Sequence, residues 1–295
     1  MIFQIKGGEK VNIEKIESVY SQGTSKQRED GFVVNYPFFG VVDGFSAPFN
    51  YKAPPMPFSG GTGGEMVRKT ILETFYSAPP TAPLEKLLWR ANERVAKIQM
   101  SRGIPLERTD LLAAVSFVFA KLEKDAVTLI QGGDCLAVWS YDPGHFGVTK
   151  NQAYPHVAEN LKIIARLLKK NGNNVAEMWV DFCPILCQRR LQDTNNPKSE
   201  ARYAVLNGQP VFRELWQKIE IPVYGLRYLL LFSDGFIPYG LTQNKTKLAE
   251  NVISIYEANG IPTLLRRKRR TDKKNEKKSY IARDEATAVA VEFSE

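Results

Sequence analysis

The chain has 295 residues, of which 43% are hydrophobic and 24% are charged, so both fractions lie near the averages of globular proteins. This composition excludes a chain that is disordered by default. The sequence also lacks any Pro, Gly or Ser stretch long enough for an interdomain linker. We therefore expect one domain that spans residues 1–295.

The apolar segments are too short for a membrane protein, because none approaches the roughly 20 residues that span a bilayer. Met1–Lys10 also lacks the apolar core of a signal peptide, so we expect a cytoplasmic protein that does not associate with membranes. The cysteines Cys135, Cys183 and Cys187 are odd in number and lack zinc spacing, which favours a reducing compartment. With only two histidines in the chain, a metal site would have to use oxygen ligands.

The net charge of +8 is concentrated in one segment. Arg266–Lys278 carries nine basic residues against Asp272 and Glu276, a net charge of +7, and the remaining chain is close to neutral. This distribution argues against a nucleic-acid-binding protein. Because the segment has no apolar residue, we predict a solvated basic surface loop at 266–278, with docking of an acidic partner as the less favoured interpretation.

Two kinds of pattern predict the secondary structure. Alternating or continuous runs of β-branched and aromatic residues predict strands at Ile16–Ser21, Phe32–Asn35, Phe38–Val42, Ala113–Leu122, Ala126–Gln131, Leu136–Tyr141, Phe146–Thr149, Arg202–Leu206, Tyr228–Phe232 and Thr287–Phe293. Helical spacing of apolar residues predicts helices at Gly64–Tyr76, Leu84–Met100, Val157–Lys170, Val175–Gln192 with a break at Pro184, Val211–Lys218 and Lys245–Ala258. Grouped strands and paired helices favour an α+β fold with antiparallel sheets.

Acidic residues fall at the ends of these strands. They are Asp43-Gly44 after Phe38–Val42, Gly133-Asp134 after Ala126–Gln131, Asp234-Gly235 after Tyr228–Phe232, and the pairs Glu29-Asp30 and Asp284-Glu285 just before strands. For any single Asp-Gly pair a hairpin turn is the simpler interpretation. It explains the set poorly, because neither Asp43-Gly44 nor Asp234-Gly235 is followed by a returning strand.

Convergence of these strand ends would bring several carboxylates together, and their repulsion would raise their pKa values unless a cation lay between them. Magnesium and manganese ions prefer such oxygen ligands. Two such ions can share a water, lower its pKa and direct it at phosphorus. The pattern therefore favours a divalent-metal site with phosphoester chemistry.

Taken in order, these motifs resemble those of the metal-dependent type 2C (PPM-type) serine/threonine protein phosphatases, in a divergent, bacterial-like form. The matching segments are Glu29-Asp30, Phe39–Gly44, Gly133-Asp134, Ser233–Phe236 and Arg283–Val291. Nearly the whole chain is covered. The resemblance implies a sandwich of two antiparallel β-sheets flanked by α-helix layers, and hydrolysis of phosphomonoesters by a water that two metal ions activate.

The resemblance also implies roles for single residues. Asp43 would bridge two Mn²⁺ or Mg²⁺ ions, and the Gly44 carbonyl would bind one of them. Asp234 and Asp284 would complete the protein ligands of the first ion, and Glu29 would serve the second.

Two further carboxylates have implied roles. Asp30 would orient the attacking water and, with Asp43, make up the catalytic pair. Asp134 together with Asp234 could hold the third ion that some members bind.

The chain also departs from the family pattern. Ser25 stands where the family commonly has a phosphate-holding arginine, so Lys26 and Arg28 are the nearby substitutes for binding the substrate phosphate. Phe45 replaces the histidine of many eukaryotic members, which removes general-acid help from that position. Pro48–Ser59 is an apparent insertion of unassigned role.

Two arginines and a histidine outside the acidic motifs could also contact a substrate. Arg189 and Arg190 lie in the region of the family's variable flap, where solvated helix-end charges are favoured over contacts with a phosphosubstrate. His156 follows Pro155 and is expected to be a solvated loop histidine.

Three classes of function follow. A metal-dependent protein serine/threonine phosphatase is favoured, a pseudophosphatase that binds phosphoproteins without turnover is the alternative, and a basic nucleic-acid-binding module is third. We expect a monomer whose partner is a phosphorylated protein substrate, with a cognate kinase as a further candidate and no nucleic acid.

Overall fold

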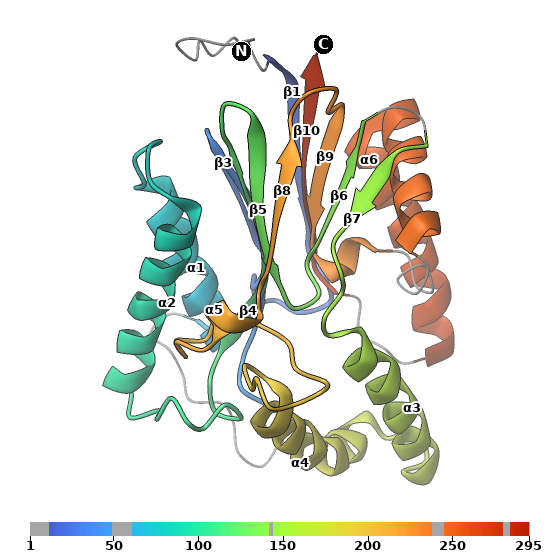
Figure 1. The fold of residues 1–295 in the computed structure, drawn as a ribbon. Coiled ribbons are helices and arrows are strands. Elements are labelled where there is room, and N and C mark those ends of the chain that lie inside the picture. Colours follow the sequence, from blue (N-terminus) through green and yellow to red (C-terminus); the bar gives the residue numbers. More distant parts are fainter. Residues whose placement is uncertain (1–11, 49–60, 142–143, 238–244, 280–283, 295) are drawn as a thin grey trace.

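The computed structural model describes the chain except for residues 1–11, 49–60, 142–143, 238–244, 280–283 and 295 (Figure 1). Of the Pro48–Ser59 insertion, all but Pro48 lies outside these described residues. The strands are β1 (Asn12–Ser21), β2 (Gly31–Asn35), β3 (Phe38–Phe45), β4 (Ala114–Leu122), β5 (Ala126–Gly132), β6 (Leu136–Ser140), β7 (Phe146–Val148), β8 (Gln217–Pro222), β9 (Tyr228–Phe232) and β10 (Ala286–Ser294). The helices are α1 (Gly63–Tyr76), α2 (Leu84–Ser101), α3 (Tyr154–Lys170), α4 (Val175–Asp193), α5 (Phe212–Leu215) and α6 (Lys245–Ser279), with a 3₁₀ turn at Asp234–Phe236.

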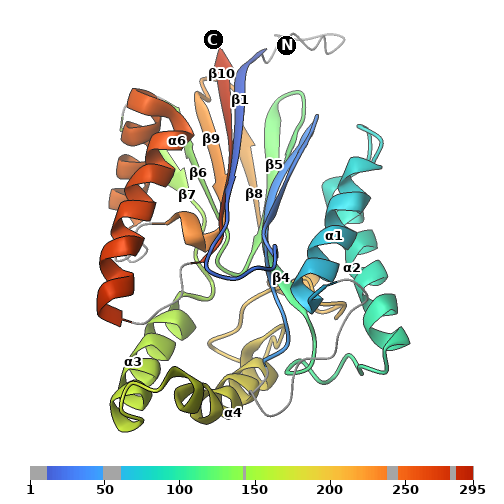
Figure 2. The same cartoon turned by 180° about the vertical axis from the view of Figure 1, so that it is seen from behind.

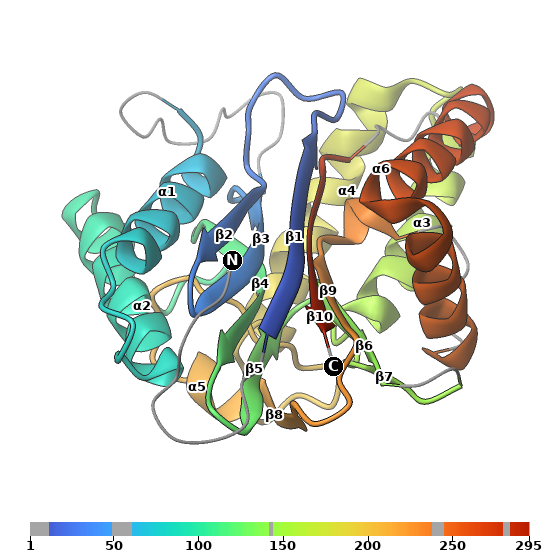
Figure 3. The ribbon, with the colours of Figure 1, turned by 90° about the horizontal axis from the view of Figure 1, so that it is seen from above.

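The strands form two antiparallel sheets, of order β1-β10-β9-β6-β7 and β2-β3-β4-β5-β8. The two sheets pack face to face, with α1 and α2 covering one outer face and α6 the other (Figure 3). Helices α3 and α4 lie at one end of the sandwich in both side views (Figures 1 and 2). The expected α+β sandwich with flanking helix layers is confirmed.

Coverage on both faces explains the continuous apolar strands. Every residue of β9 is buried, because Leu229 and Leu231 face the opposite sheet while Leu230 and Phe232 face α6. Fully covered strands of this kind do not alternate polar and apolar residues, whichever direction their neighbours run.

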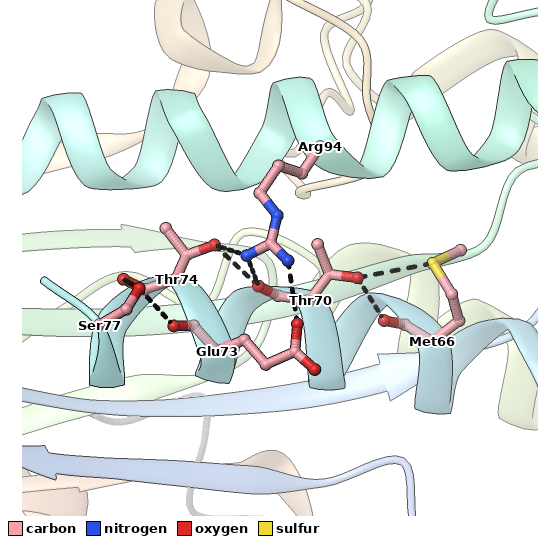
Figure 4. Close-up of polar contacts among 6 residues, drawn as sticks. All are labelled: Met66, Thr70, Glu73, Thr74, Ser77 and Arg94. Carbon is pink, nitrogen blue, oxygen red and sulfur yellow. Dashed lines mark hydrogen bonds and ion pairs between the residues drawn. The ribbon is translucent and has the colours of Figure 1, made fainter.

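An arginine joins the two helices of one outer layer (Figure 4). Arg94 of α2 donates through Nη1 to the Thr74 hydroxyl at 2.7 Å and to the Thr70 carbonyl at 3.3 Å of α1. Its Nη2 pairs with Glu73 at 2.9 Å. These contacts fix the rotation of α1, whose first residues border the acidic strand ends described below.

Two predicted elements in the segment after α4 are wrong. Arg202–Leu206 is not a strand, because the Asn195 side chain takes both backbone hydrogen bonds of Val205 that a neighbouring strand would otherwise use. The helix predicted at Val211–Lys218 is limited to the four residues of α5, and the chain then forms β8 against the edge of β5. The alternation of Ile219 and Ile221, which both face the core between the sheets, was the signal for this strand.

The break predicted in α4 at Pro184 is also absent, since the helix runs from Val175 to Asp193. Met178 and Phe182 are buried in a small apolar cluster with Leu168 of α3. This packing holds α4 together across the hydrogen bond that proline removes.

The basic segment predicted to be a loop is instead helical. Helix α6 turns at Gly260, whose φ of 70° is left-handed, and continues through Arg266 to Ser279. Lys268 and Asp272 lie one helical turn apart and form an ion pair at 2.5 Å with only 2% of each side chain exposed. The segment is therefore held in place by charged residues that were expected to be solvated.

No helix among the described residues is long and apolar enough to cross a membrane.

We predict that Asp272→Asn lowers the free energy of unfolding by about 3 kcal/mol, because it removes the buried carboxylate that pairs with Lys268 and Arg269. Urea denaturation measures this change. The double replacement Lys268→Met with Asp272→Leu removes both charges and is the control, expected to recover most of the loss. Equal loss in the single and double variants would contradict the argument.

Candidate functional site

The predicted strand-end acids converge at the end of the sandwich that α3 and α4 cover. They border one cavity of about 380 Å³, whose acidic lining comprises Glu29, Asp30, Asp43, Asp134, Asp234, Asp284 and Glu285. These residues come from β3, the β5–β6 connection, the turn after β9 and the segments before β2 and β10. Gly44 also lines the cavity. The hairpin-turn interpretation of the Asp-Gly pairs therefore fails.

Two of the glycines beside these acids permit close backbone packing. A Cβ on Gly44 would lie 2.6 Å from the Glu29 carbonyl oxygen, and a Cβ on Gly235 would lie 1.6 Å from the Glu285 carbonyl oxygen. Both distances are impossible for a real side chain. Glycine at these positions brings the ends of β3 and β9 against the acidic segments that precede β2 and β10.

Asp30 is the most deeply buried of the predicted catalytic residues, with 2% of its surface exposed. The Ser233 hydroxyl donates to Asp30 Oδ2 at 2.7 Å, and Ser233 Oγ in turn accepts from the Thr287 backbone N–H at 3.1 Å. Desolvation raises the pKa of Asp30 to about 7, and the nearby Glu285 charge adds to the rise. The carboxyl is fixed in orientation and titrates near neutrality.

Asp43, Asp134 and Asp234 crowd one another behind Asp30. Desolvation raises the pKa of all three, and mutual repulsion raises the pKa values of Asp43 and Asp234 well above the ordinary range. The charges of Asp30, Asp234 and Asp134 all add to the rise in the pKa of Asp43. Asp284 lies at the exposed rim, and its charge adds to the repulsion on Asp234.

Glu29 is held from the other side by hydroxyl groups. Its Oε1 accepts from Ser46 Oγ at 2.8 Å and from Thr62 Oγ1, where Thr62 caps the N-terminus of α1. Desolvation raises the pKa of Glu29 despite these hydrogen bonds. The start of α1 thus helps to position the Glu29 carboxylate, which comes from the segment before β2.

Glu285 has a structural role that sequence analysis did not identify. Its Oε2 accepts from the backbone N–H groups of Glu29 at 2.6 Å and Asp30 at 2.9 Å, and its Oε1 accepts from the Tyr20 hydroxyl. The residue therefore fixes the backbone that presents Glu29 and Asp30. The Asp-Glu pair before the last strand was the only sequence signal.

The two predicted phosphate-binding cations do not line the cavity, although Ser25 and Gln27 do. Lys26 is exposed, and the Arg28 guanidinium stacks over the Tyr20 ring at 4.0 Å. Arg190 is instead the basic side chain on the cavity wall.

Arg190 is buried, with 8% of its surface exposed. Its expected placement as a solvated helix-end charge is therefore wrong. His156 is also on the wall, in the first turn of α3, and its Nε2 lies 2.6 Å from the Ala201 carbonyl oxygen. The expected solvated loop histidine is thus wrong as well, because the ring packs against Tyr203 and the Ala201 carbonyl of the segment after α4.

The donor chemistry of the cavity fits hard divalent cations. The repelling carboxylates supply oxygen ligands, and a divalent cation among them would offset their repulsion. In the described ranges, no group of three or more His, Cys, Asp or Glu side chains is already arranged to hold a metal ion.

The fold is that of bacterial serine/threonine phosphatases. The chain resembles the Mycobacterium tuberculosis serine/threonine phosphatase PstP/Ppp with a TM-score of 0.57 and 13% identity, covering 95% of this chain and 99% of that one. It resembles the Staphylococcus aureus serine/threonine phosphatase Stp1 with a TM-score of 0.57 and 12% identity, covering 99% and 100%. A PstP catalytic domain in complex with two manganese ions matches with a TM-score of 0.55 and 13% identity, covering 95% and 98%.

Neither protein-family models nor curated protein sequences match the chain. At these identities the structural likeness establishes the PPM-type fold. The chemistry of this chain must be argued from its own residues.

Proposed function

We propose that this protein is a metal-dependent phosphomonoester hydrolase that acts on phosphoserine or phosphothreonine in proteins. The observation that carries the proposal is the set of crowded carboxylates with raised pKa values on one cavity of a serine/threonine phosphatase fold. Such perturbed acids cluster at functional sites more often than in structural networks.

The predicted metal ligands of the cavity would serve two ions. Asp43 would serve two Mn²⁺ or Mg²⁺ ions, and the Gly44 carbonyl would bind one of them. Asp234 and Asp284 would complete the protein ligands of the first ion, and Glu29 would serve the second. When bound, two such ions lower the pKa of a water and offset charge on the phosphoryl oxygens.

The other residues of the site would orient the attacking water, form a third cation site and contact the substrate. Asp30, fixed by Ser233, would orient the attacking water through its carboxylate. Asp134, which is hydrogen-bonded to Ser116, would contribute with Asp234 to a weaker third cation site. Phe45, Val157 and Leu186 give the cavity an apolar side that can contact the leaving residue of a phosphoprotein.

The alternative is a pseudophosphatase that binds phosphoproteins without turnover. Two departures from the family pattern favour it: Ser25 stands at the position of the phosphate-holding arginine, and Cys135-Leu136 follow Gly133-Asp134 where serine-arginine is usual. The retained carboxylates at every metal-binding position of the resemblance favour the enzyme.

Purified protein with p-nitrophenyl phosphate tests the proposal. We expect turnover with manganese or magnesium, loss of turnover with EDTA, and recovery when metal is restored. Turnover of a phosphothreonine peptide, measured by phosphate release, tests the protein substrate. Turnover that is absent with every metal, combined with retained binding of the phosphopeptide, would establish the pseudophosphatase instead.

A further inference from the structure

Arg190 lies three residues from the end of α4, with its side chain against the acidic cavity. Its Nη1 donates to the Ser46 carbonyl at 2.9 Å, and its guanidinium stacks over the Phe45 ring at 4.6 Å. Ser46 also donates to Glu29, and Phe45 ends the strand that carries Asp43. The guanidinium therefore contacts the end of the segment that carries the predicted metal ligands Asp43 and Gly44.

The electrostatic position of Arg190 is unusual. Desolvation lowers the pKa of its guanidinium, and the neighbouring Tyr203 and Glu29 only partly offset this effect. Among the described residues, no Asp or Glu lies within ion-pair distance of Arg190, whereas the adjacent Arg189 pairs with Glu159 at 2.7 Å. A buried cation without a bonded carboxylate is costly unless a ligand supplies the anion.

The donor geometry suits a phosphate group. A guanidinium carries five N–H donors in a planar fork, and the Ser46 carbonyl accepts from one terminal nitrogen. The rest of the fork can reach two oxygens of one phosphoryl group, which is the bidentate contact that makes arginine the usual phosphate ligand.

We propose that Arg190 binds the phosphoryl group of the substrate and supplies, from α4, the cation that is missing at Ser25. This inference rests on the proposed function. Ser25 lines the same cavity, so the space that its short side chain leaves open is continuous with the Arg190 wall. Arg28 is excluded from the role because it stacks on Tyr20 outside the cavity lining.

The neighbour Arg189 provides a matched control. It is also an arginine of α4, but it joins α4 to α3 through Glu159 and Asn160 and does not line the cavity. Its replacement by glutamine tests the effect of losing a cation from the same helix turn.

The experiment measures binding of inorganic phosphate to the manganese-loaded full chain by isothermal titration calorimetry. We expect Arg190→Gln to weaken binding roughly 10- to 100-fold, because a charge-assisted contact is lost. Arg190→Lys should weaken it about 10-fold, because the charge stays and the fork is lost. Arg189→Gln and Arg28→Gln should bind phosphate like the wild type.

Steady-state kinetics with p-nitrophenyl phosphate give the second readout. We expect the KM and the phosphate inhibition constant to rise in both Arg190 variants, with partial rescue in Arg190→Lys, and melting temperatures confirm folding. Unchanged phosphate affinity in folded Arg190→Gln, or an equal loss in Arg28→Gln, overturns the inference. Failure of the proposed function is distinct, because it appears as wild-type protein that binds inorganic phosphate but does not hydrolyse p-nitrophenyl phosphate.

Discussion

Asp43→Asn is expected to lower phosphoester turnover by roughly 10³-fold or more while the protein remains folded. Asp43 lies at the centre of the acidic cavity, where the charges of Asp30, Asp134 and Asp234 all act on it. A neutral amide at this position cannot balance two divalent ions, so the electrostatic support of the reaction is lost.

The same substitution should leave the metal-free protein intact. Desolvation and the neighbouring acids raise the pKa of Asp43 well above its ordinary value, so a charged carboxylate is disfavoured in the metal-free cavity. Asn has nearly the same shape and carries no charge. The substitution also removes one source of repulsion on Asp234.

Turnover with manganese and thermal unfolding in EDTA, measured on the same preparation, separate the two effects. Asp181→Asn is the control: Asp181 pairs with Lys170 on the surface of the α3–α4 hairpin, and its loss should leave turnover unchanged. Wild-type activity in Asp43→Asn would show that the residue does not bridge the metals. Unfolding of the variant in EDTA would contradict the argument that a charge at this position is unfavourable without metal.

The sandwich could be predicted from the sequence because its strands carry strong local signals. Runs such as Phe38–Val42 and Tyr228–Phe232 are buried on both faces, and their apolar composition specifies strands without reference to partners. The short strand β8 was missed because its alternating signal is limited to Ile219 and Ile221, and because the helix predicted at Val211–Lys218 covered its first two residues.

The acidic residues of the site could be predicted because each follows or precedes such a strand. Arg190 and Glu285 could not be assigned in the same way. Arg190 reaches the cavity only through the packing of α4 on the end of the sandwich, and Glu285 acts through backbone N–H groups 256 and 255 residues away in the chain. The spacing of residues along the sequence indicates neither of these two contacts.

The helical conformation of the basic segment Arg266–Lys278 could not be predicted from its composition either. Its composition indicates a solvated loop, yet an i,i+4 pair between Lys268 and Asp272 stabilises it as helix, and Arg269 donates to the carbonyls of Ser21 and Asp284. Composition therefore predicted the conformation of the segment and the solvation of Lys268 and Asp272 wrongly, because paired charges can be buried.

The stability of the metal-free protein is expected to fall as the pH rises from about 5 to 8. The folded pKa of Asp30 is about 7 against an ordinary 3.8, so the folded state binds more protons than the unfolded state across this interval. The proton-linked stability is therefore fully present below about pH 4 and is lost as the pH rises through 7. For Asp30 alone the full loss is roughly 4 kcal/mol, of which roughly 3 kcal/mol falls between pH 5 and pH 8, and Asp43 and Asp234 act with the same sign.

Urea denaturation in EDTA at pH 5 and pH 8 measures this dependence, and manganese should remove most of it, because a bound cation replaces the protons in the cavity. Asp43→Asn should flatten the dependence in EDTA, since it eliminates one of the titrating carboxyls. The exposed Asp181, whose hydrogen bond to Lys170 holds its pKa below the ordinary value, completes its titration at lower pH and contributes nothing in this interval. Stability that rises with pH in EDTA would mean that the cavity acids are ionised in the folded protein, and it would remove the argument that a cation is needed to hold them together.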